Sequence, residues 1–258
     1  MPAPAALVVA HPGHELRLYR WLEIARPLTL IMTDGSGSAS SRIQSSIEIL
    51  QSAGCTPGRM MGAFTDREIY RLLLNGDAEP IVAMTIEIAE SLIEHDIRSV
   101  VTDAFEMYNP THDLCSVVAG LAAERASAAT RHSITVYEYA VTQAPFRDEE
   151  TVLLDDAALE RKLAAARRYD GLRSEVETLV ERIGVDGLRR ETFKPVTASA
   201  RPKPASKPFY ETYGEKQVAA GHYDTVIRYD PHFLSFVDRL TARLGEIAVP
   251  DAVAACRS

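Results

Sequence analysis

Cysteine is scarce in this chain: 258 residues contain only Cys55, Cys115 and Cys256. Three widely separated cysteines are too few for the disulfide framework that holds small secreted domains together. They fit a reducing compartment, and we expect Cys115 to behave as a small buried hydrophobe. A disulfide-rich secreted scaffold is therefore excluded.

Long apolar runs and excess positive charge are missing as well. The first apolar run is interrupted by Pro12, no basic stretch precedes a signal-like segment, and no later run is long enough to cross a bilayer. Lysine and arginine number 28 against 36 acidic residues, a formal net charge of −8. This balance argues against a dedicated nucleic-acid binder. We expect a soluble cytoplasmic protein with no membrane span.

What the sequence does contain is an ordinary globular composition, 46% hydrophobic and 25% charged. In the first 145 residues, short apolar runs alternate with segments of helical periodicity. We expect strands at residues 5–10, 28–32, 60–64, 98–105 and 134–141, and helices at 16–25, 40–53, from 66, at 81–93 and up to 128. Thr65 and Glu68 have the spacing of a capping box for the third of these helices.

Such alternation predicts an α/β fold: a Rossmann-like, mostly parallel sheet with helices on both faces. Loops that carry function lie beyond the carboxyl ends of the strands in these sheets. We therefore expect residues 1–145 to form a Rossmann-like domain with its reactive loops on one edge.

The pattern changes after residue 145. Residues 155–183 have the pattern of one long charged helix, 195–208 are rich in proline, and 225–229 resemble a strand before a last helix at 231–244. We expect residues 146–258 to form a C-terminal helical and extended appendage that packs on or near the site. The long helix either covers the domain or pairs with a partner subunit, so a homo-oligomer is one open option.

Three histidines are the candidates for chemistry. His11 and His14 lie three positions apart where the first strand ends, and His112 follows another strand. Three imidazoles and a water molecule form the open tetrahedral ligand set of a catalytic zinc. The His-x-x-His pair alone is a weak signal, and a polar turn that caps a helix is the alternative. The position of His112 after a neighbouring strand favours a Zn²⁺ site.

The sequence around these histidines resembles a known family. Val8-Val-Ala-His-Pro-Gly-His-Glu15 is similar to the Ala-His-Pro-Asp-Asp-Glu signature of the PIG-L/LmbE-like zinc-dependent N-acetylglucosamine deacetylases. Thr33-Asp-Gly35 resembles the family's Thr-x-Gly segment, and Asn109-Pro-Thr-His112 resembles its His-Pro-Asp-His motif. The resemblance covers about the first half of the chain. It implies that His11, His14 (in place of an aspartate) and His112 bind Zn²⁺.

The chain departs from that pattern at the residues that move protons. The family's base aspartate falls on Gly13, its assisting histidine on Asn109, and the aspartate partner of that histidine on Thr111. Asn109 can donate a hydrogen bond to an oxyanion but cannot shuttle protons. Glu106 and Asp34, each on a loop that follows a strand, are our candidates for a replacement catalytic carboxylate.

Other residues are candidates for binding substrate. Arg42, beside a glycine- and serine-rich loop, and Tyr108 and Asn109, before His112, are predicted to contact it. Tyr210, Glu211 and Glu215 either close over the pocket or belong to an aromatic core cluster, and the role of residues 209–229 stays open.

The resemblance implies a zinc-dependent hydrolase that deacetylates a small N-acetylated sugar or glycoconjugate, with a zinc-bound water attacking the acetamide carbonyl. A catalytically inactive relative that only binds metal or sugar is the alternative, because Gly13 and Asn109 replace catalytic groups. A third option is a hydrolase of another substrate, with proton transfer rebuilt around Glu106 or Asp34.

Overall fold

The computed structural model describes the whole chain except residues 38–39, 131, 148, 170, 197–205 and 250–258. Its described part contains a seven-stranded sheet in the order β3-β2-β1-β4-β5-β7-β6. The strands in that order are Pro57–Phe64, Leu28–Thr33, Ala5–Val9, Ser99–Asp103, Thr135–Tyr139, Arg190–Val196 and Glu150–Leu153. The first five are parallel, and β7 and β6 are antiparallel to their neighbours.

The central strand β1 is buried on both faces, as its continuous apolar run predicts. Val8 lies opposite Leu30 of β2 and Thr102 of β4. The chain winds outward from β1 through β2 to β3 on one side and through β4 to β5 on the other. The switch point of the sheet therefore lies between β1 and β4, where this class of fold places its site.

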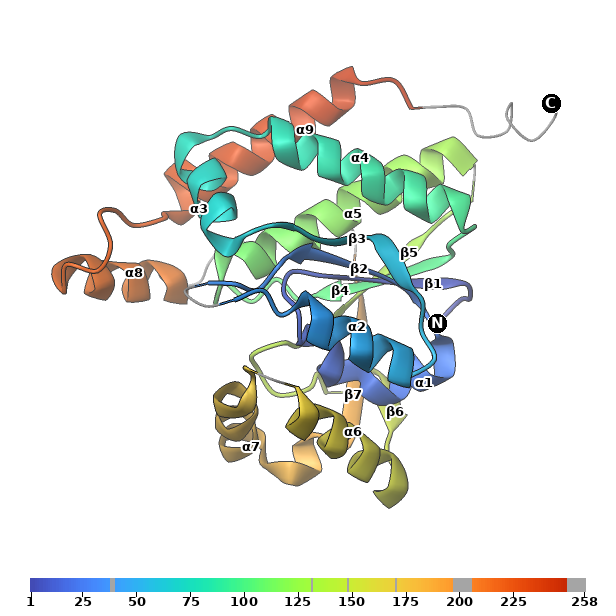
Figure 1. The fold of residues 1–258 in the computed structure, drawn as a ribbon. Helices are drawn as coiled ribbons and strands as arrows, with labels where there is room; N and C mark the ends of the chain where they lie inside the picture. Colours follow the sequence, from blue (N-terminus) through green and yellow to red (C-terminus); the bar gives the residue numbers. More distant parts are fainter. Residues whose placement is uncertain (38–39, 131, 148, 170, 197–205, 250–258) are drawn as a thin grey trace.

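Two helical layers cover the sheet (Figure 1). Alternate side chains of β1 pack with α4 (Glu79–Glu94), α5 (Pro110–Thr130) and α9 (Ser235–Glu246) on one face. The others pack with α1 (Tyr19–Ala25), α2 (Ile43–Ser52) and α6 (Asp156–Arg168) on the other. The predicted Rossmann-like α/β architecture is confirmed.

The predicted capping box is confirmed at the start of α3 (Asp66–Asn75). The Thr65 side chain accepts a hydrogen bond from the Glu68 N–H, and the Glu68 carboxylate accepts one from the Thr65 N–H at 2.7 Å. Gly76, at φ 67°, ends the helix in the left-handed conformation. This cap fixes Asp66 as the first residue of α3. Asp66 lies beside His11, in the site described below.

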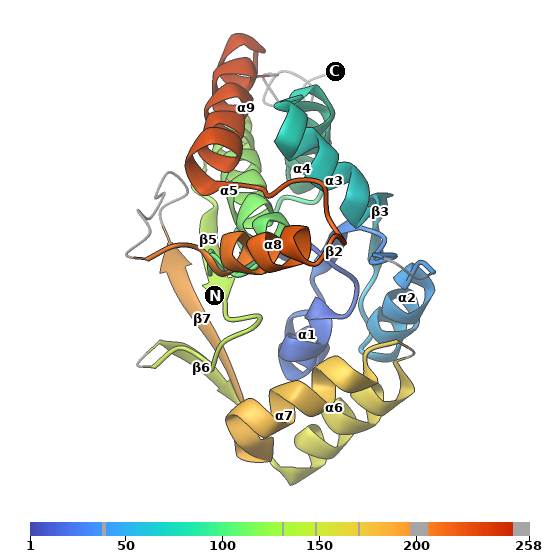
Figure 2. The ribbon, with the colours of Figure 1, turned by 90° about the vertical axis from the view of Figure 1, so that its left-hand side faces the viewer.

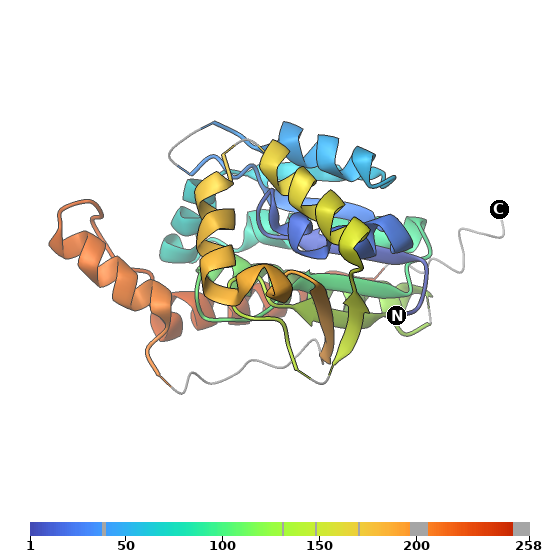
Figure 3. The same ribbon diagram turned by 90° about the horizontal axis from the view of Figure 1, so that it is seen from below.

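The prediction of one helix over 155–183 is wrong. The chain forms α6 and then α7 (Arg173–Gly187), with a break at Tyr169. The Tyr169 side chain turns inward, where its hydroxyl bonds Ser46 Oγ at 2.8 Å and donates to the carbonyl of Arg42 at 3.2 Å. Gly171, at φ 83°, takes the left-handed conformation that interrupts a helix, and the Tyr169 contacts hold the break in place. Seen from below, α6 and α7 lie across the face that carries α1 (Figure 3).

Strands β6 and β7 were not predicted, because their sequences are short and polar. They extend the same sheet beyond β5, and Glu191, Thr192 and Phe193 of β7 are buried. Residues on both sides of position 145 thus contribute to one sheet. The division into units 1–145 and 146–258 stays a prediction.

The C-terminal part differs from the sequence pattern in one further respect. Most of the proline-rich segment 195–208 lies outside the described residues, and α8 (Phe209–Ala219) follows it. The strand predicted at 225–229 is wrong: the chain is irregular there and enters a π-helical turn, Tyr229–Leu234, before α9. The Tyr229 N–H donates to Glu211 Oε1 at 2.8 Å instead of to a strand.

Among the described residues, no helix combines the length and hydropathy needed to cross a membrane.

Candidate active site

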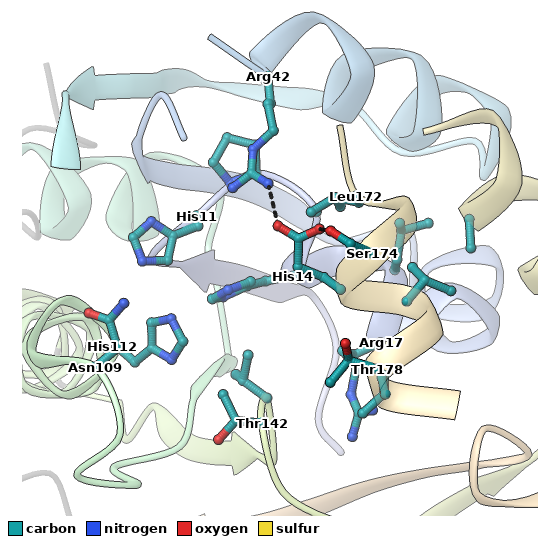
Figure 4. A pocket seen from close by; sticks show the side chains of 18 of the residues that line it. His11, His14, Arg17, Arg42, Asn109, His112, Thr142, Leu172, Ser174 and Thr178 are labelled. Atoms are coloured by element: carbon teal, nitrogen blue, oxygen red, sulfur yellow. Dashed lines mark hydrogen bonds and ion pairs between the residues drawn. The ribbon is translucent and has the colours of Figure 1, made fainter. Parts of the chain in front are cut away.

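The three predicted histidines meet beyond the carboxyl ends of β1 and β4 (Figure 4). Ring centroids are 5.1 Å apart for His11 and His14, 5.0 Å for His11 and His112, and 4.6 Å for His14 and His112. His11 and His14 flank the turn that leads into a 3₁₀ helix, η1 (His14–Leu18), and His112 lies in the first turn of α5. Side chains about 100 residues apart in sequence thus come into edge-to-face contact.

Two of the rings are held by oxygen groups through Nδ1. His11 Nδ1 lies 2.8 Å from Thr33 Oγ1 and 2.9 Å from Asp66 Oδ1. His14 Nδ1 lies 2.8 Å from Asp103 Oδ2. A carboxylate on one ring nitrogen is the usual support of a metal-binding histidine, since it orients the ring and leaves Nε2 as the donor.

The remaining nitrogens suit a cation. His11 Nε2 and His112 Nδ1 are buried with no hydrogen-bond partner, an unfavourable state for polar atoms that lack a ligand. Burial lowers the pKa of His11, although Asp66 opposes the shift, and lowers the pKa of His112 still further. Neutral imidazoles with unshared nitrogen lone pairs are what zinc requires. In the described part of the chain, no group of three or more histidine, cysteine, aspartate or glutamate side chains is already arranged to hold a metal ion.

The two supporting carboxylates stay ionised. Burial would raise the pKa of Asp103, but His14, His112 and the Ala10 N–H outweigh it and lower that pKa to about 2. For Asp66, the hydrogen bond and charge of His11 likewise outweigh burial and lower the pKa to about 2. Negative charge behind the imidazoles strengthens them as donors to a metal.

Glu15 braces the turn between the histidines. Its buried carboxylate accepts hydrogen bonds from the Gly13 N–H at 2.7 Å and from Ser46 Oγ at 2.6 Å. Burial raises its pKa against the effect of these donors. Glu15 therefore shapes the backbone at Gly13 rather than facing the histidines' common centre.

A cavity of about 630 Å³ opens beside the histidines. One wall contains the histidines with Asp66, Tyr70, Tyr108 and Asn109. Across from it, α7 and its N-cap contribute residues at the spacing of successive turns: Leu172, Glu175, Val176, Leu179 and Arg182. Residues of α6, among them Leu163 and Ala166, also line the cavity. The segment that the sequence suggested as a cover thus lines the cavity.

Leu172 occupies the space beside Gly13. A Cβ built on Gly13 would lie 2.1 Å from Leu172 Cδ1. Gly13 also has φ +103°, a backbone conformation that residues other than glycine rarely adopt. The position at which the resemblance expects the base aspartate is therefore filled by a leucine from another part of the chain.

The predicted catalytic carboxylates lie outside this cavity. Glu106 accepts hydrogen bonds from the N–H groups of Val141, Thr142 and Gln143 and from the Thr142 hydroxyl. Asp34 Oδ1 accepts the Ser36 N–H at 2.9 Å. Neither belongs to the cavity wall. The structure does not bring them to the histidines, and their catalytic roles stay predictions.

The predicted substrate-binding residues Arg42, Tyr108 and Asn109 all line the cavity. Arg42 Nη1 lies 3.7 Å from Glu175 Oε1, and its Nε is buried without a partner. Asn109 Oδ1 accepts the Thr111 N–H at 2.8 Å at the start of α5, which leaves the side-chain nitrogen as the atom that can donate. That they bind substrate stays a prediction.

Tyr210, Glu211 and Glu215 do not line the cavity. Tyr210 is buried, Glu211 accepts hydrogen bonds from Arg228 and the Tyr229 N–H, and Glu215 pairs with Arg228 and with Lys207 at 2.9 Å. These contacts attach α8 to the segment that follows it.

Sequence reasoning missed three carboxylates. Asp103 ends β4, Asp66 follows the capping threonine, and Glu175 is one of many charges in a predicted surface helix. Asp103 and Asp66 could have been found from the sequence, since an acidic residue at a strand end or after a loop falls on the functional edge of the sheet. Glu175 had none, because only the tertiary fold turns its face inward.

No protein-family model matches the sequence, and no curated protein matches it either. Solved structures do resemble the fold. The A40926 pseudoaglycone deacetylase Dbv21 is 18% identical, with a TM-score of 0.54 over 76% of this chain and 98% of its own. The conserved protein TT1542 from Thermus thermophilus is also 18% identical, with a TM-score of 0.51 over 79% and 98%.

The 4-carboxy-2-hydroxymuconate hydratase GalB from Pseudomonas putida KT2440 is 13% identical, with a TM-score of 0.50 over 78% of this chain and 99% of its own. At such identities the likeness is one of fold. Since the similar structures include a deacetylase and a hydratase, the fold alone does not determine the reaction, and the site must.

Proposed function

We propose that this protein is a zinc-dependent hydrolase that removes the acetyl group from an N-acetylated sugar or glycoconjugate. The observation that carries the proposal is the group of three histidines beside the cavity, two of them backed by carboxylates and two with buried unpartnered nitrogens. The sequence resemblance supports the same reaction class, and Dbv21, a deacetylase, shows that this fold can carry it.

His11, His14 and His112 would hold the zinc ion. When bound, zinc supplies a Lewis acid that polarises the amide carbonyl and makes a water molecule more acidic. Asp103 and Asp66 orient the first two rings through Nδ1. An all-histidine set carries no ligand charge, which leaves the metal more electron-poor than a set that contains a carboxylate.

Glu175 is the carboxylate that we assign to proton transfer. Of the two carboxylates in the described cavity wall, Asp66 Oδ1 lies 2.9 Å from His11 Nδ1, whereas Glu175 has a 58% exposed side chain. It lies one helical turn after Leu172, the residue packed against Gly13, so it faces the same side of α7. Ser174 Oγ donates to Glu175 Oε2 at 3.0 Å, and Arg42 approaches Oε1.

In this mechanism Glu175 takes the proton of the attacking water and returns it to the amine that leaves. One carboxylate then serves as base and acid, as the absence of both the family aspartate and its histidine requires. The side-chain nitrogen of Asn109 donates to the oxygen that develops negative charge, and Arg42 binds a polar group of the sugar.

Metal content and acetate release test the proposal. Purified protein is expected to contain one zinc ion per chain and to release acetate from at least one of a panel of N-acetylhexosamines and their conjugates. His14→Ala should lose both properties, and His95→Ala, at the end of α4, should lose neither. Absence of stoichiometric zinc from the wild-type protein would contradict the metal assignment.

One observation favours a second candidate function. Leu172 fills the space of the missing base, so a relative that binds zinc and sugar without hydrolysing it fits the same cavity. Stoichiometric zinc and measurable sugar binding with no acetate release from any substrate would establish this binding role.

A further inference from the structure

Three aromatic side chains at the C-terminal end of the chain are largely exposed. Phe209 is 48%, Tyr213 45% and Tyr223 45% exposed, and no other aromatic residue of the described ranges is among the exposed large hydrophobic side chains. Single exposed hydrophobic residues are common, whereas a contiguous group marks a place where something binds.

Two of these rings are contiguous and continue a wall of the cavity. Tyr108, which lines the cavity, stacks on Phe209 with a centroid distance of 4.5 Å and an interplanar angle of 1°. Phe209 stacks in turn on Tyr213 at 6.0 Å and 23°. We call Tyr108, Phe209 and Tyr213 the aromatic platform.

The exposure of these rings does not come from a loosely attached helix. The Phe209 N–H donates to the Met107 carbonyl at 2.9 Å, which joins α8 to the loop of the site. On the other side of α8, Tyr210, Glu211 and Gly214 are buried, and Glu211 holds the Tyr229 N–H. Figure 2 shows α8 crossing in front of the sheet, with α6 and α7 below it. One face of α8 is fixed to the protein, and the aromatic face is left open.

We propose that the aromatic platform is a second subsite, and that the parts of its stacked rings left exposed contact a sugar ring of a glycoconjugate whose N-acetyl group lies in the cavity. A sugar ring has an apolar face of C–H groups and a rim of hydroxyls. Planar tyrosines match both, because each has an apolar ring and a polar end. Continuity with the cavity through Tyr108 favours a distal part of the substrate over a second copy of the chain. This inference rests on the proposed function and specifies its substrate as longer than a monosaccharide.

Calorimetric binding to zinc-loaded protein tests the platform without requiring turnover. The probes are N-acetylglucosamine and its β-1,4-linked oligomers of two to four residues. The wild-type protein should bind the oligomers more tightly than the monosaccharide. Phe209→Ala and Tyr213→Ala should each weaken oligomer binding by about three- to tenfold, the size of a typical aromatic contact. Monosaccharide binding should be unchanged in Tyr213→Ala, because Tyr213 is not among the residues that line the cavity.

Ile24→Ala and Leu153→Ala, which truncate exposed hydrophobic side chains on α1 and β6, are the matched controls and should change neither affinity. Circular dichroism of each variant checks that α8 remains folded. Equal affinity of the wild-type protein for monosaccharide and oligomers, or an unchanged oligomer affinity in both platform variants, overturns the proposal.

The platform and the proposed function fail in different ways. Acetate release that is independent of chain length keeps the hydrolase and rejects the platform. Length-dependent binding without acetate release keeps the platform and rejects the hydrolase. Sedimentation velocity tests whether a second copy of the chain occupies this face instead. A wild-type dimer that Phe209→Ala converts to a monomer would identify the face as a subunit interface and reject the sugar subsite.

Discussion

Leu172 packs directly against Gly13, close enough that any Cβ at position 13 would lie 2.1 Å from Leu172 Cδ1. The two residues belong to opposite halves of the chain, one between His11 and His14 and the other at the start of α7. A side chain at position 13 and the present place of the Leu172 side chain therefore exclude each other, so Leu172 would have to move to admit one. The same helix introduces Glu175 one turn later.

Gly13→Asp should destabilise the protein rather than restore a base. A side chain at φ +103° is strained by about 1–3 kcal/mol, and the collision with Leu172 adds to this cost. Urea denaturation of the zinc-free protein measures the loss of unfolding free energy. Gly221→Asp is the matched control, because Gly221 has φ +74° with nothing within 4 Å. Gly13→Asp with Leu172→Ala should recover the collision part only; equal losses in Gly13→Asp and Gly221→Asp would show that Leu172 does not matter.

Glu175→Gln should lower kcat by roughly 10²–10⁴-fold, the usual contribution of a general acid–base. Zinc content and KM should stay close to wild type, because the amide keeps the size of the side chain and ligates no metal. Glu177→Gln, on an exposed part of the same helix outside the cavity wall, is the control. Steady-state acetate release gives both constants. Full activity of Glu175→Gln would contradict the role of Glu175 in proton transfer and leave Glu106 and Asp34 as the candidates.

Asp66→Asn should weaken zinc binding by about 10–100-fold, the usual effect of removing a carboxylate behind a ligating histidine. Asparagine keeps the shape of the side chain but loses the charge that faces His11 Nδ1 at 2.9 Å. Competition with a chromogenic chelator measures the affinity. Asp77→Asn, an exposed aspartate after the other end of α3, controls for the loss of one negative charge. An unchanged zinc affinity in Asp66→Asn would argue that His11 is not a ligand.

The pH dependence of stability should reflect Asp103. His14 and other neighbours lower its pKa to about 2 from an ordinary 3.8, so in this range the unfolded chain binds more protons than the folded protein. The stability that Asp103 contributes is fully present above about pH 4 and is lost as the pH falls through 2. Urea denaturation of metal-free wild type and Asp103→Asn from pH 6 to 2 should show a difference that shrinks toward the acid end. A difference independent of pH would contradict this.

Local patterns were enough to predict the parallel half of the fold. Each of these local patterns spans only a few residues: an apolar run such as Leu28–Thr33, the capping box at Thr65, or a histidine at the end of a strand. A parallel sheet then brings the carboxyl ends of its strands to one edge. This logic places His11, His14 and His112 together from the sequence alone.

The second wall of the site could not be predicted in this way. The predicted long helix breaks between α6 and α7, where Gly171 has φ 83° and the Tyr169 hydroxyl contacts Ser46. Glu175 lines the cavity because α7 follows a new direction after this break. Strand β7 is recognisable only by its pairing with β5 and β6. The Tyr169 contact and the pairing of β7 join residues far apart in the chain, which no local periodicity encodes. Gly171 was a local signal for the helix break, and the helical periodicity on both sides of it hid that signal.

Because of the break at Tyr169, the histidines and the α7 residues of the cavity are held by different parts of the fold. The histidines are fixed by the sheet, and their carboxylate partners lie at the end of β4 and the start of α3. Much of the opposite wall comes from α7, and Tyr169 ties the chain just before this helix to Ser46. Substitutions along α7 can therefore change the shape and charge of the substrate space while the histidines keep their places, so divergence in substrate preference should concentrate in residues 172–182.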